Sequence, residues 1–418
     1  MINKEYLYVW YEEKLVGKLW EDTTGKIGFE YEKSWIENGF PISQQLPLHI
    51  ISYPPSDNKA HQFFANLLPE AMAREHIIRD LKITNTDYNL IKAIGGECAG
   101  ALSITIDKTP NNEQENYKKL SQEKFKQLLL RRGQISTFYK DEKHPRLSLA
   151  GAQDKCVILL ENNDYYLPQK NAASTHILKF EIADYRNIPI YEYFMTKLAE
   201  EIGMPVASIQ LMKFEKHHYL LIERYDRLLS EGKKITRIHQ EDFCQALGIS
   251  YNKKYQQEGG PSFVDCYNLL KETSNQPIKD TENLLRWNIF NFLAGNSDAH
   301  AKNISLLYHD EKQIKLAPFY DLVCTRAVPR IDSKLAMSIS DEYNPDKITL
   351  KHWLDLAEKC NINQRFMKKT LMETASKLIE SFPNIYKKIE TLHGPFPAIQ
   401  RIKSIVEKQC KKTIKETS

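Results

Sequence analysis

The residues best suited to chemistry lie in one segment, Asn296–Asn303 (NSDAHAKN), directly after an apolar run that ends at Leu293. Within this segment, four residues separate Asp298 from Asn303. The protein-kinase catalytic loop has the same Asp-x4-Asn spacing, in which the carboxylate accepts a proton from the substrate hydroxyl and the Asn binds Mg²⁺. Lys302 lies where an ammonium group would neutralise charge on a transferring phosphoryl group. The segment therefore predicts phosphoryl transfer, with Asp298 and Lys302 as catalytic residues.

A second carboxylate follows in the segment Phe319–Leu322 (FYDL), which contains Asp321. Between it and Asn303, the runs 304–307 and 314–317 predict a β-hairpin. A kinase places its main Mg²⁺ ligand just after such a hairpin, and Mg²⁺ prefers hard oxygen ligands. Asn303 and Asp321 are therefore the predicted metal ligands.

Upstream, the segment Ser148–Lys155 (SLAGAQDK) is a glycine-containing turn between two strand-like runs. Small residues there let backbone N–H groups approach phosphate oxygens, although the segment is neither a Walker A loop nor GxGxxG. Lys179, on the next apolar strand, is the candidate for binding the ATP phosphates, with Glu192 on the following helix as its partner. Glu223 and Tyr225 follow an apolar run, where a hinge would hold adenine.

Each of these features also has a structural explanation. An isolated Asp-x4-Asn is common by chance, Asp298 and His300 are suited to capping the next element, and Gly151 suits an ordinary hairpin turn. A zinc site at His300 is disfavoured because no second His or Cys lies at ligand spacing nearby. The order of the features favours the kinase interpretation, because glycine loop, lysine, hinge, Asp-x4-Asn and second Asp follow one another as they do in kinases.

The elements predicted around these residues begin with a β-meander. Aromatic and β-branched runs indicate its strands at 6–10, 14–20 and 29–31. Residues 60–80 then predict a helix with a break at Pro69.

A polar stretch at 107–117 is the best candidate for a boundary. Beyond it, the order strand, loop, strand, strand, helix, strand, strand is that of a kinase small lobe, and from about Glu241 the chain is mostly helical. We therefore predict an α+β, two-lobed protein-kinase-like fold. Its parts are an N-terminal β-rich subdomain (1–108), a small lobe with the phosphate loop and hinge (109–230) and a helical C-terminal lobe with the catalytic loop (231–418).

Composition limits the other possibilities. The net charge of +4 over 418 residues is too small to indicate nucleic-acid binding by itself. The seven cysteines are scattered and include no CxxC, which disfavours a disulfide framework or a zinc ribbon and favours a reducing compartment. No secretory signal is evident, and no apolar run approaches the roughly 18 residues of a membrane span. We therefore expect a cytoplasmic protein with no membrane partner.

Taken together, the motifs resemble those of the HipA family, the kinase toxins of bacterial type II toxin–antitoxin pairs. The resemblance covers nearly the whole chain. The segments that carry it are Gln45–Leu48 (QLPL), Phe63–Glu70 (FFANLLPE), Gly95–Leu102 (GGECAGAL), Leu147–Lys155 (LSLAGAQDK), Thr175–Lys179 (THILK), Glu223–Arg227 (ERYDR), Gly259–Pro261 (GGP), Asn296–Asn303 (NSDAHAKN) and Pro318–Leu322 (PFYDL).

The resemblance implies ATP and Mg²⁺ as cofactors and Asp298 as the catalytic acid/base. Ser148 would be the serine whose autophosphorylation expels the phosphate loop and inactivates the enzyme. A phosphoserine there would compete with ATP, since it adds negative charge beside a loop that holds phosphate. The implied nucleotide-binding positions are Ala150, Gly151, Ala152, Gln153, Asp154, Lys155, Lys179, Glu223, Arg224, Tyr225, His300, Asn303, Tyr320 and Asp321.

The resemblance also implies partners. The family is known for phosphorylating aminoacyl-tRNA synthetases, most familiarly glutamyl-tRNA synthetase, which stops translation and promotes persistence. A HipB-like helix-turn-helix antitoxin is implied, with operator DNA contacted mainly through it. Two alternatives remain open: a co-repressor that bridges antitoxin dimers on DNA with little catalysis, and a small-molecule kinase, since lipid- and aminoglycoside-kinase relatives share the Asp-x4-Asn and second-Asp pattern.

Overall fold

The computed structural model describes residues 5–109, 117–134, 150–151, 153, 155–182, 185–229, 234–309 and 313–418. The chain divides into two compact units, each assembled from three separate segments. The first unit comprises Met1–Ile182, Met212–Tyr251 and Leu306–Gln313, and the second comprises Ala183–Leu211, Asn252–Ser305 and Ile314–Ser418. The three-part division predicted from the sequence remains a prediction.

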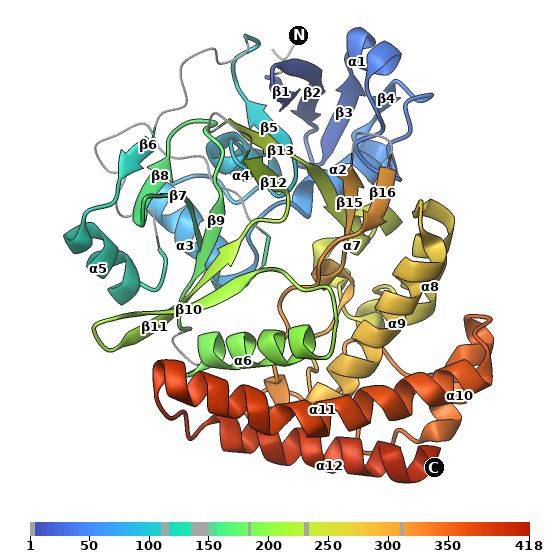
Figure 1. Cartoon of the computed structure of the whole chain (residues 1–418). Coiled ribbons are helices and arrows are strands. Elements are labelled where there is room, and N and C mark those ends of the chain that lie inside the picture. The colour runs from blue at the N-terminus through green and yellow to red at the C-terminus, as the bar shows by residue number, and fades with distance from the viewer. Residues whose placement is uncertain are drawn as a thin grey trace. The chain divides into compact units, whose positions relative to one another are not determined.

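A five-stranded antiparallel sheet opens the first unit (Figure 1). Its order is β4-β3-β2-β1-β5, with strands β1 (Leu7–Tyr11), β2 (Lys14–Glu21), β3 (Ile27–Tyr31), β4 (Ser52–Tyr53) and β5 (Leu102–Thr105). Val9, Leu19 and Phe29, one from each of the first three strands, are fully buried. Burial of β-branched and aromatic side chains on one face is what stabilises such a sheet. The predicted meander is confirmed, because β1, β2 and β3 pair in succession.

Four helices accompany this sheet in the sequence. They are α1 (Lys33–Asn38), α2 (Lys59–Ala65), α3 (Ala71–Leu81) and α4 (Asp87–Ile94). Pro69 lies between α2 and α3, which confirms the predicted break. The Thr86 side chain accepts a hydrogen bond from Asn89 N and so caps α4.

The six-stranded sheet has the order β10-β11-β9-β7-β8-β6. Its strands are β6 (Tyr117–Lys119), β7 (Lys155–Glu161), β8 (Asp164–Pro168), β9 (His176–Lys179), β10 (Ile209–Phe214) and β11 (His217–Glu223). The helix α5 (Gln122–Leu130) is capped by Ser121, and its buried Phe125 and Leu128 join Cys156 and Leu178 in one apolar core. This core holds β7 and β9 rigidly, and β9 carries Lys179.

Shorter pairings complete the described strands. The hairpin β12 (Arg227–Leu229) and β13 (Ile235–Arg237) follows β11, and β14 (His239–Asp242) leads into α7 (Phe243–Leu247). The strands β15 (Ser305–His309) and β16 (Gln313–Leu316) pair as the sequence predicted, and β14 lies beside β15.

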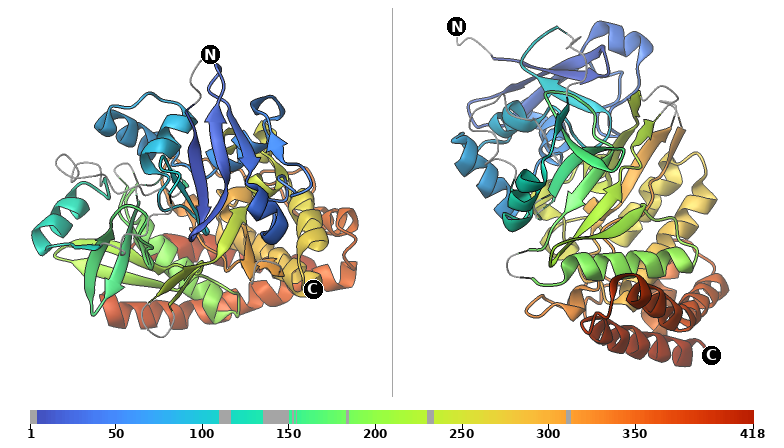
Figure 2. Two further views of the ribbon diagram at one scale, coloured as in Figure 1. Left: turned by 90° about the horizontal axis from the view of Figure 1, so that it is seen from above. Right: turned by 60° about the vertical axis from the view of Figure 1, so that its left-hand side comes forward.

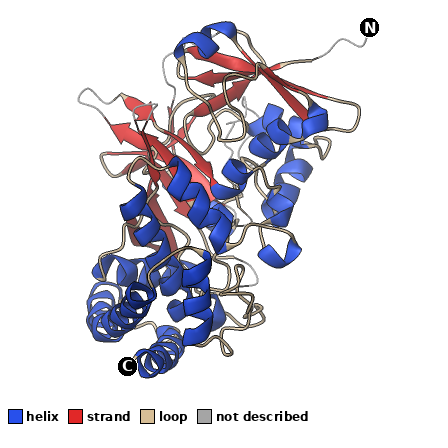
Figure 3. Cartoon of the chain, turned by 90° about the vertical axis from the view of Figure 1, so that its right-hand side faces the viewer, coloured by secondary structure: helices blue, strands red, loops and turns tan. Residues whose placement is uncertain are grey.

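The second unit is mainly helical. Its helices are α6 (Ile188–Glu201), α8 (Phe263–Thr273), α9 (Pro277–Ala294), α10 (Leu350–Lys359), α11 (Gln364–His393) and α12 (Ile399–Thr417). The long helices α11 and α12 lie side by side (Figures 1 and 2), and the chain ends among helices (Figure 3). Phe194 of α6 packs on Phe382 of α11 with ring centroids 4.7 Å apart. The central helix α9 buries Trp287, Phe290 and Leu293 and ends directly before the predicted catalytic loop.

Among the described residues, none of the helices combines the length and apolar character that crossing a bilayer requires.

Candidate active site

The predicted catalytic loop, Asn296–Asn303, follows Gly295, the residue that caps the C-terminal end of α9. Its backbone is left-handed, with φ +72°, and its N–H donates to carbonyls of the last turn. A Cβ atom at this position would lie 2.8 Å from Ile405 Cγ2, closer than atoms can approach. Glycine satisfies both requirements, because it adopts positive φ without strain and has no side chain. The direction in which the chain leaves α9 is therefore fixed by this residue.

Hydrogen bonds then hold the loop in one conformation. The Asn296 amide donates to Asn291 Oδ1 of α9 (2.8 Å), and its oxygen accepts from the Asp298 N–H (3.1 Å). The carbonyl of Asp298 accepts from the His300 N–H (3.0 Å) and from Asn303 Nδ2 (3.0 Å). The two residues of the Asp-x4-Asn motif are thus bonded to one another within the loop.

The carboxylate of Asp298 combines accessibility with orientation. Its side chain is 47% exposed, which leaves room for a substrate hydroxyl. Oδ1 accepts a hydrogen bond of 2.7 Å from the Tyr255 hydroxyl, and His300 Nε2 lies 3.7 Å from the same oxygen. The His300 side chain is only 5% exposed and packs edge-on against the Tyr255 ring. A half-exposed, oriented carboxylate is suited to accept a proton.

The segment with Tyr320 and Asp321 is attached to this loop. The Tyr320 hydroxyl donates to the Lys302 carbonyl (2.9 Å) and bonds the Ser305 hydroxyl (2.8 Å). Asp321 follows with a left-handed backbone, φ +55°. Such strain in a non-glycine residue is concentrated at functional sites. Lys302 and Asn303, at 7% and 9% exposure, are buried in the loop.

Asn303 and Asp321 offer amide and carboxylate oxygens, the kind of donor that Mg²⁺ prefers. No group of three or more His, Cys, Asp or Glu side chains suited to a metal occurs in the part of the chain that the structure describes. Mg²⁺ needs only one or two protein oxygens, since substrate phosphates and waters complete its shell. The side-chain nitrogen of Asn303 donates to the Asp298 carbonyl. The side-chain oxygen of Asn303 is therefore the atom that would bind a metal. The roles of Asn303 and Asp321 as Mg²⁺ ligands remain predictions.

In the first unit, the described part of the predicted phosphate loop contains a glycine with a positive φ. Gly151 has φ +114°, and its carbonyl accepts from the Glu70 N–H (3.0 Å). Gln153 donates to the Phe180 carbonyl (2.5 Å), and Lys155 Nζ donates to the Ala150 carbonyl (2.6 Å). A Cβ at Gly151 would lie 2.6 Å from Lys155 Nζ, the movable end of a flexible side chain, so the positive φ is what favours glycine there. Ser148, Ala152 and Asp154 lie outside the described residues.

Lys179 lies on β9, directly opposite Lys155 on β7 and Leu220 on β11. It is 6% exposed, which is unusual for lysine and requires compensating interactions. Its role in binding the ATP phosphates remains a prediction. Glu192 is buried on α6, and its pairing with Lys179 remains a prediction.

The predicted hinge residues have three different environments. Glu223 ends β11 and is exposed, and the Tyr225 hydroxyl donates to Gln240 Oε1 (2.6 Å). The Arg224 side chain is buried and donates to Asp226 (2.7 and 2.9 Å) and to Glu97 (3.2 Å). Its side chain is therefore structural, and its part in a nucleotide site remains a prediction.

Glu97 is the centre of a buried ion network that the sequence did not predict. Its carboxylate accepts from Arg224, Arg227 (2.9 Å) and Arg237 (2.7 Å), and Ser174 N–H donates to it (2.9 Å). Burial opposes ionisation, but the guanidinium groups of Arg227, Arg237 and Arg224 outweigh it and hold the pKa of the Glu97 carboxyl below its usual range. The network joins residues 97–100 to the strands that flank the hinge. The motif GGECAGAL was the available signal, but it gave no role for Glu97.

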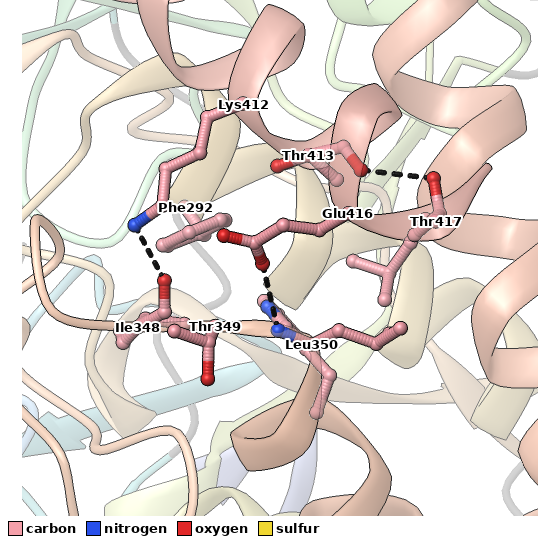
Figure 4. A pocket seen from close by; sticks show the side chains of 10 residues that line it. Phe292, Ile348, Thr349, Leu350, Lys412, Thr413, Glu416 and Thr417 are labelled. Carbon is pink, nitrogen blue, oxygen red and sulfur yellow. Dashed lines mark hydrogen bonds between the residues drawn. The ribbon is translucent and has the colours of Figure 1, made fainter.

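The pocket of the second unit drawn in Figure 4 is separate from these residues. Its polar groups bond to the backbone at the start of α10. Lys412 Nζ donates to the Ile348 carbonyl (2.7 Å), and Glu416 accepts from the Leu350 N–H (2.8 Å). These bonds satisfy groups at a helix end, so the pocket is a structural junction between α10 and α12.

The α+β fold and the braced Asp-x4-Asn loop define a protein of the kinase-like class. The structure is similar to that of HipA from Shewanella oneidensis in a complex with HipB and operator DNA, with a TM-score of 0.81 and 26% identity. That match covers 98% of this chain and 96% of the other chain.

Sequence comparison gives the same result. Residues 7–105 match the HipA N-terminal domain family, and residues 147–382 match the HipA-like C-terminal domain family. The chain is 34% identical over 404 residues to the Y4mE protein of Sinorhizobium fredii, covering 93% of each chain. It is 31% identical over 351 residues to the serine/threonine-protein kinase toxin HipA of Shewanella oneidensis, covering 80% of this chain and 78% of that protein. The chain belongs to the HipA family.

Proposed function

We propose that this chain is an ATP- and Mg²⁺-dependent serine/threonine protein kinase of the HipA type, acting as a toxin in the bacterial cytoplasm. The observation that carries the proposal is the geometry of Asp298. Its carboxylate is accessible and oriented, and the amide of Asn303 is tied to its carbonyl at the spacing that kinases use.

The proposed reaction assigns each residue one task. The hydroxyl oxygen of a protein serine attacks the γ-phosphorus of ATP, and Asp298 accepts the proton of that hydroxyl. The bond from the γ-phosphorus to the bridging oxygen breaks, and ADP leaves with this oxygen. Lys302 offsets negative charge on the transferring group, and Lys179 binds the phosphates that remain with ADP. Asn303 and Asp321 hold Mg²⁺, which neutralises charge on the phosphate oxygens when it is bound. His300, Tyr320 and the residues of the phosphate loop and hinge complete the proposed nucleotide site.

Self-inactivation at Ser148 is part of the proposal. Ser148 begins the glycine-containing segment Ser148–Lys155 and lies two residues before Ala150, the first of the proposed nucleotide-binding positions. A phosphoserine there carries about −1.5 to −2 charges at neutral pH and would compete with the phosphates of ATP for the same backbone donors.

The complex of the Shewanella protein supports a proposal that this chain binds an antitoxin. That HipA was solved with HipB and operator DNA. We expect this chain to bind a HipB-like helix-turn-helix antitoxin and to approach operator DNA mainly through it. The proposed target is an aminoacyl-tRNA synthetase such as glutamyl-tRNA synthetase, whose modification would stop translation and cause growth arrest.

Peptide mass spectrometry after incubation with Mg²⁺-ATP tests the proposed activity. We expect one phosphate on Ser148 of the wild type and none in Asp298→Asn, because the amide cannot accept the proton. Asp341→Asn is the matched control, since it removes an exposed carboxylate of the same unit that pairs with Lys359 at the surface, and it should label like the wild type.

Absence of phosphate on the wild-type chain, despite ATP binding, would contradict the proposal. It would favour the co-repressor that bridges antitoxin dimers on DNA. Phosphate transferred to a small hydroxyl compound and to no protein would favour a small-molecule kinase.

A further inference from the structure

We infer that Tyr255 is a positioning residue for phosphoryl transfer, because its hydroxyl holds the Asp298 carboxylate in the orientation that accepts the substrate proton. The inference rests on the proposed function, in which Asp298 is the proton acceptor. Tyr255 lies 43 residues before Asp298 in the sequence and donates to Oδ1 at 2.7 Å.

An aspartate that is half exposed needs such a partner. The Asp298 side chain is 47% exposed, so little packing around it selects a rotamer. A hydrogen bond from a bulky, ordered side chain restricts rotation of the carboxylate without covering it. Only one of the two carboxylate oxygens accepts from Tyr255, and the other, Oδ2, is the atom that would receive the serine proton.

The backbone around Tyr255 is held firmly enough for this task. Its carbonyl accepts from the N–H groups of Glu258 (2.9 Å) and Gly260 (3.0 Å). A Cβ at Gly260 would lie 2.3 Å from the Lys253 carbonyl, so the turn closes tightly only with glycine. This gives a structural reason for the glycines before Pro261.

A second connection runs from this turn to the catalytic loop. Gln256 N–H donates to the Ala336 carbonyl, and Ala336 N–H donates to the Ser297 carbonyl, both at 3.0 Å. The Gln256 side chain also accepts from the N–H of Ser338 (2.8 Å). Backbone hydrogen bonds between the two segments thus hold Tyr255 and Asp298 near one another, in addition to their own hydrogen bond. This favours a Tyr255 hydroxyl that orients Asp298 over one that blocks the substrate.

The ring of Tyr255 has a separate role. It packs edge-on against His300, with centroids 5.6 Å apart and an interplanar angle of 78°. Tyr255→Phe keeps this ring contact and removes only the hydroxyl, so it separates the support of Asp298 from the packing of the loop.

The test compares Tyr255→Phe with wild type in the initial rate of Ser148 phosphorylation across ATP concentrations. We expect the maximal rate constant of Ser148 labelling to fall about tenfold to hundredfold and the ATP concentration that gives half of this rate to stay within about twofold, because the lost bond orients the acceptor and not the nucleotide. Thermal unfolding should be nearly unchanged. Tyr386→Phe is the matched control, since it removes the hydroxyl of a partly exposed tyrosine on α11 that bonds to Glu390 at the surface (3.4 Å), and it should behave as wild type.

The outcomes separate this inference from the proposed function. An active wild type with an equally active Tyr255→Phe would overturn the inference alone. Faster labelling of Ser148 in Tyr255→Phe would also overturn it, because the hydroxyl would then obstruct the substrate. A wild type without transfer would overturn the proposed function and the inference with it.

Discussion

At the scale of single residues, two buried carboxylates of the first unit have opposite electrostatic environments. Glu97 faces three guanidinium groups, which stabilise its charged form. Glu241 is also fully buried but accepts only from neutral donors, the Ser43 hydroxyl (2.6 Å), the Gln44 N–H (3.1 Å) and the Tyr308 hydroxyl. Burial without a compensating cation raises the pKa of Glu241 to about 7.

This difference predicts a pH effect on stability. The pKa of Glu241 lies above its value in the unfolded chain, about 4.3. The folded state therefore binds the proton more tightly, and the contribution of this group to stability falls as pH rises from about 4 to 7, then stays constant. Over this pH range, the contribution of Glu241 to the free energy of unfolding falls by about 3 kcal/mol. Denaturant unfolding of wild type and Glu241→Gln between pH 5 and 8 measures it.

We expect the wild type to lose stability relative to Glu241→Gln across this range, because the glutamine has no proton to lose. A stability difference that is independent of pH would show that Glu241 is ionised throughout.

At the scale of elements, the structure at the end of α9 leads us to expect that adding one methyl group at Gly295 destabilises the fold. Gly295→Ala introduces both a left-handed alanine and a contact of 2.8 Å with Ile405. We expect a loss of about 2 kcal/mol or more, since the backbone accounts for about 1–2 kcal/mol and overpacking adds to it. Chemical denaturation measures the loss.

Gly203→Ala is the matched control for Gly295→Ala. Gly203 follows α6 with φ +79°, and its nearest neighbour would be Arg286 Nη2 at 4.0 Å. It should show the backbone effect alone. Equal losses in the two variants would mean that Ile405 moves aside at no cost.

The elements also show what the sequence could reveal. Strands β1 to β3 and helices α2, α3 and α9 were predictable because their apolar residues recur with the period of the element. The spacing of Asp298 and Asn303 was visible because both lie in one loop. The contact of Tyr255 with Asp298 spans 43 residues and that of Arg224 with Glu97 spans 127. No local period encodes such pairs, because the fold alone brings them together.

At the scale of the whole molecule, the seven cysteines are all free and buried. Burial raises the pKa of the Cys324 and Cys360 thiols to about 12, so few thiolates exist at neutral pH. We expect no thiol of the native chain to react with Ellman's reagent within minutes, and all seven to react after denaturation. The measurement is the absorbance of the released thiolate.

Ser404→Cys provides the positive control for this reaction, since Ser404 is exposed on α12 and its replacement should react in the native chain. A rapidly reacting thiol in the native wild type would contradict the burial of that cysteine.

The alternation of segments between the two units has a consequence for synthesis. A ribosome releases the chain from its N-terminus, yet the first unit takes its last segment from Leu306–Gln313 and the second continues from Ile314. Neither unit can be completed until more than 300 residues have emerged. Apolar residues of both units therefore stay exposed on the nascent chain for most of its translation. Chaperones protect such exposed surfaces from aggregation during this time. A protein proposed to stop translation would thus become active only after its own translation is nearly finished.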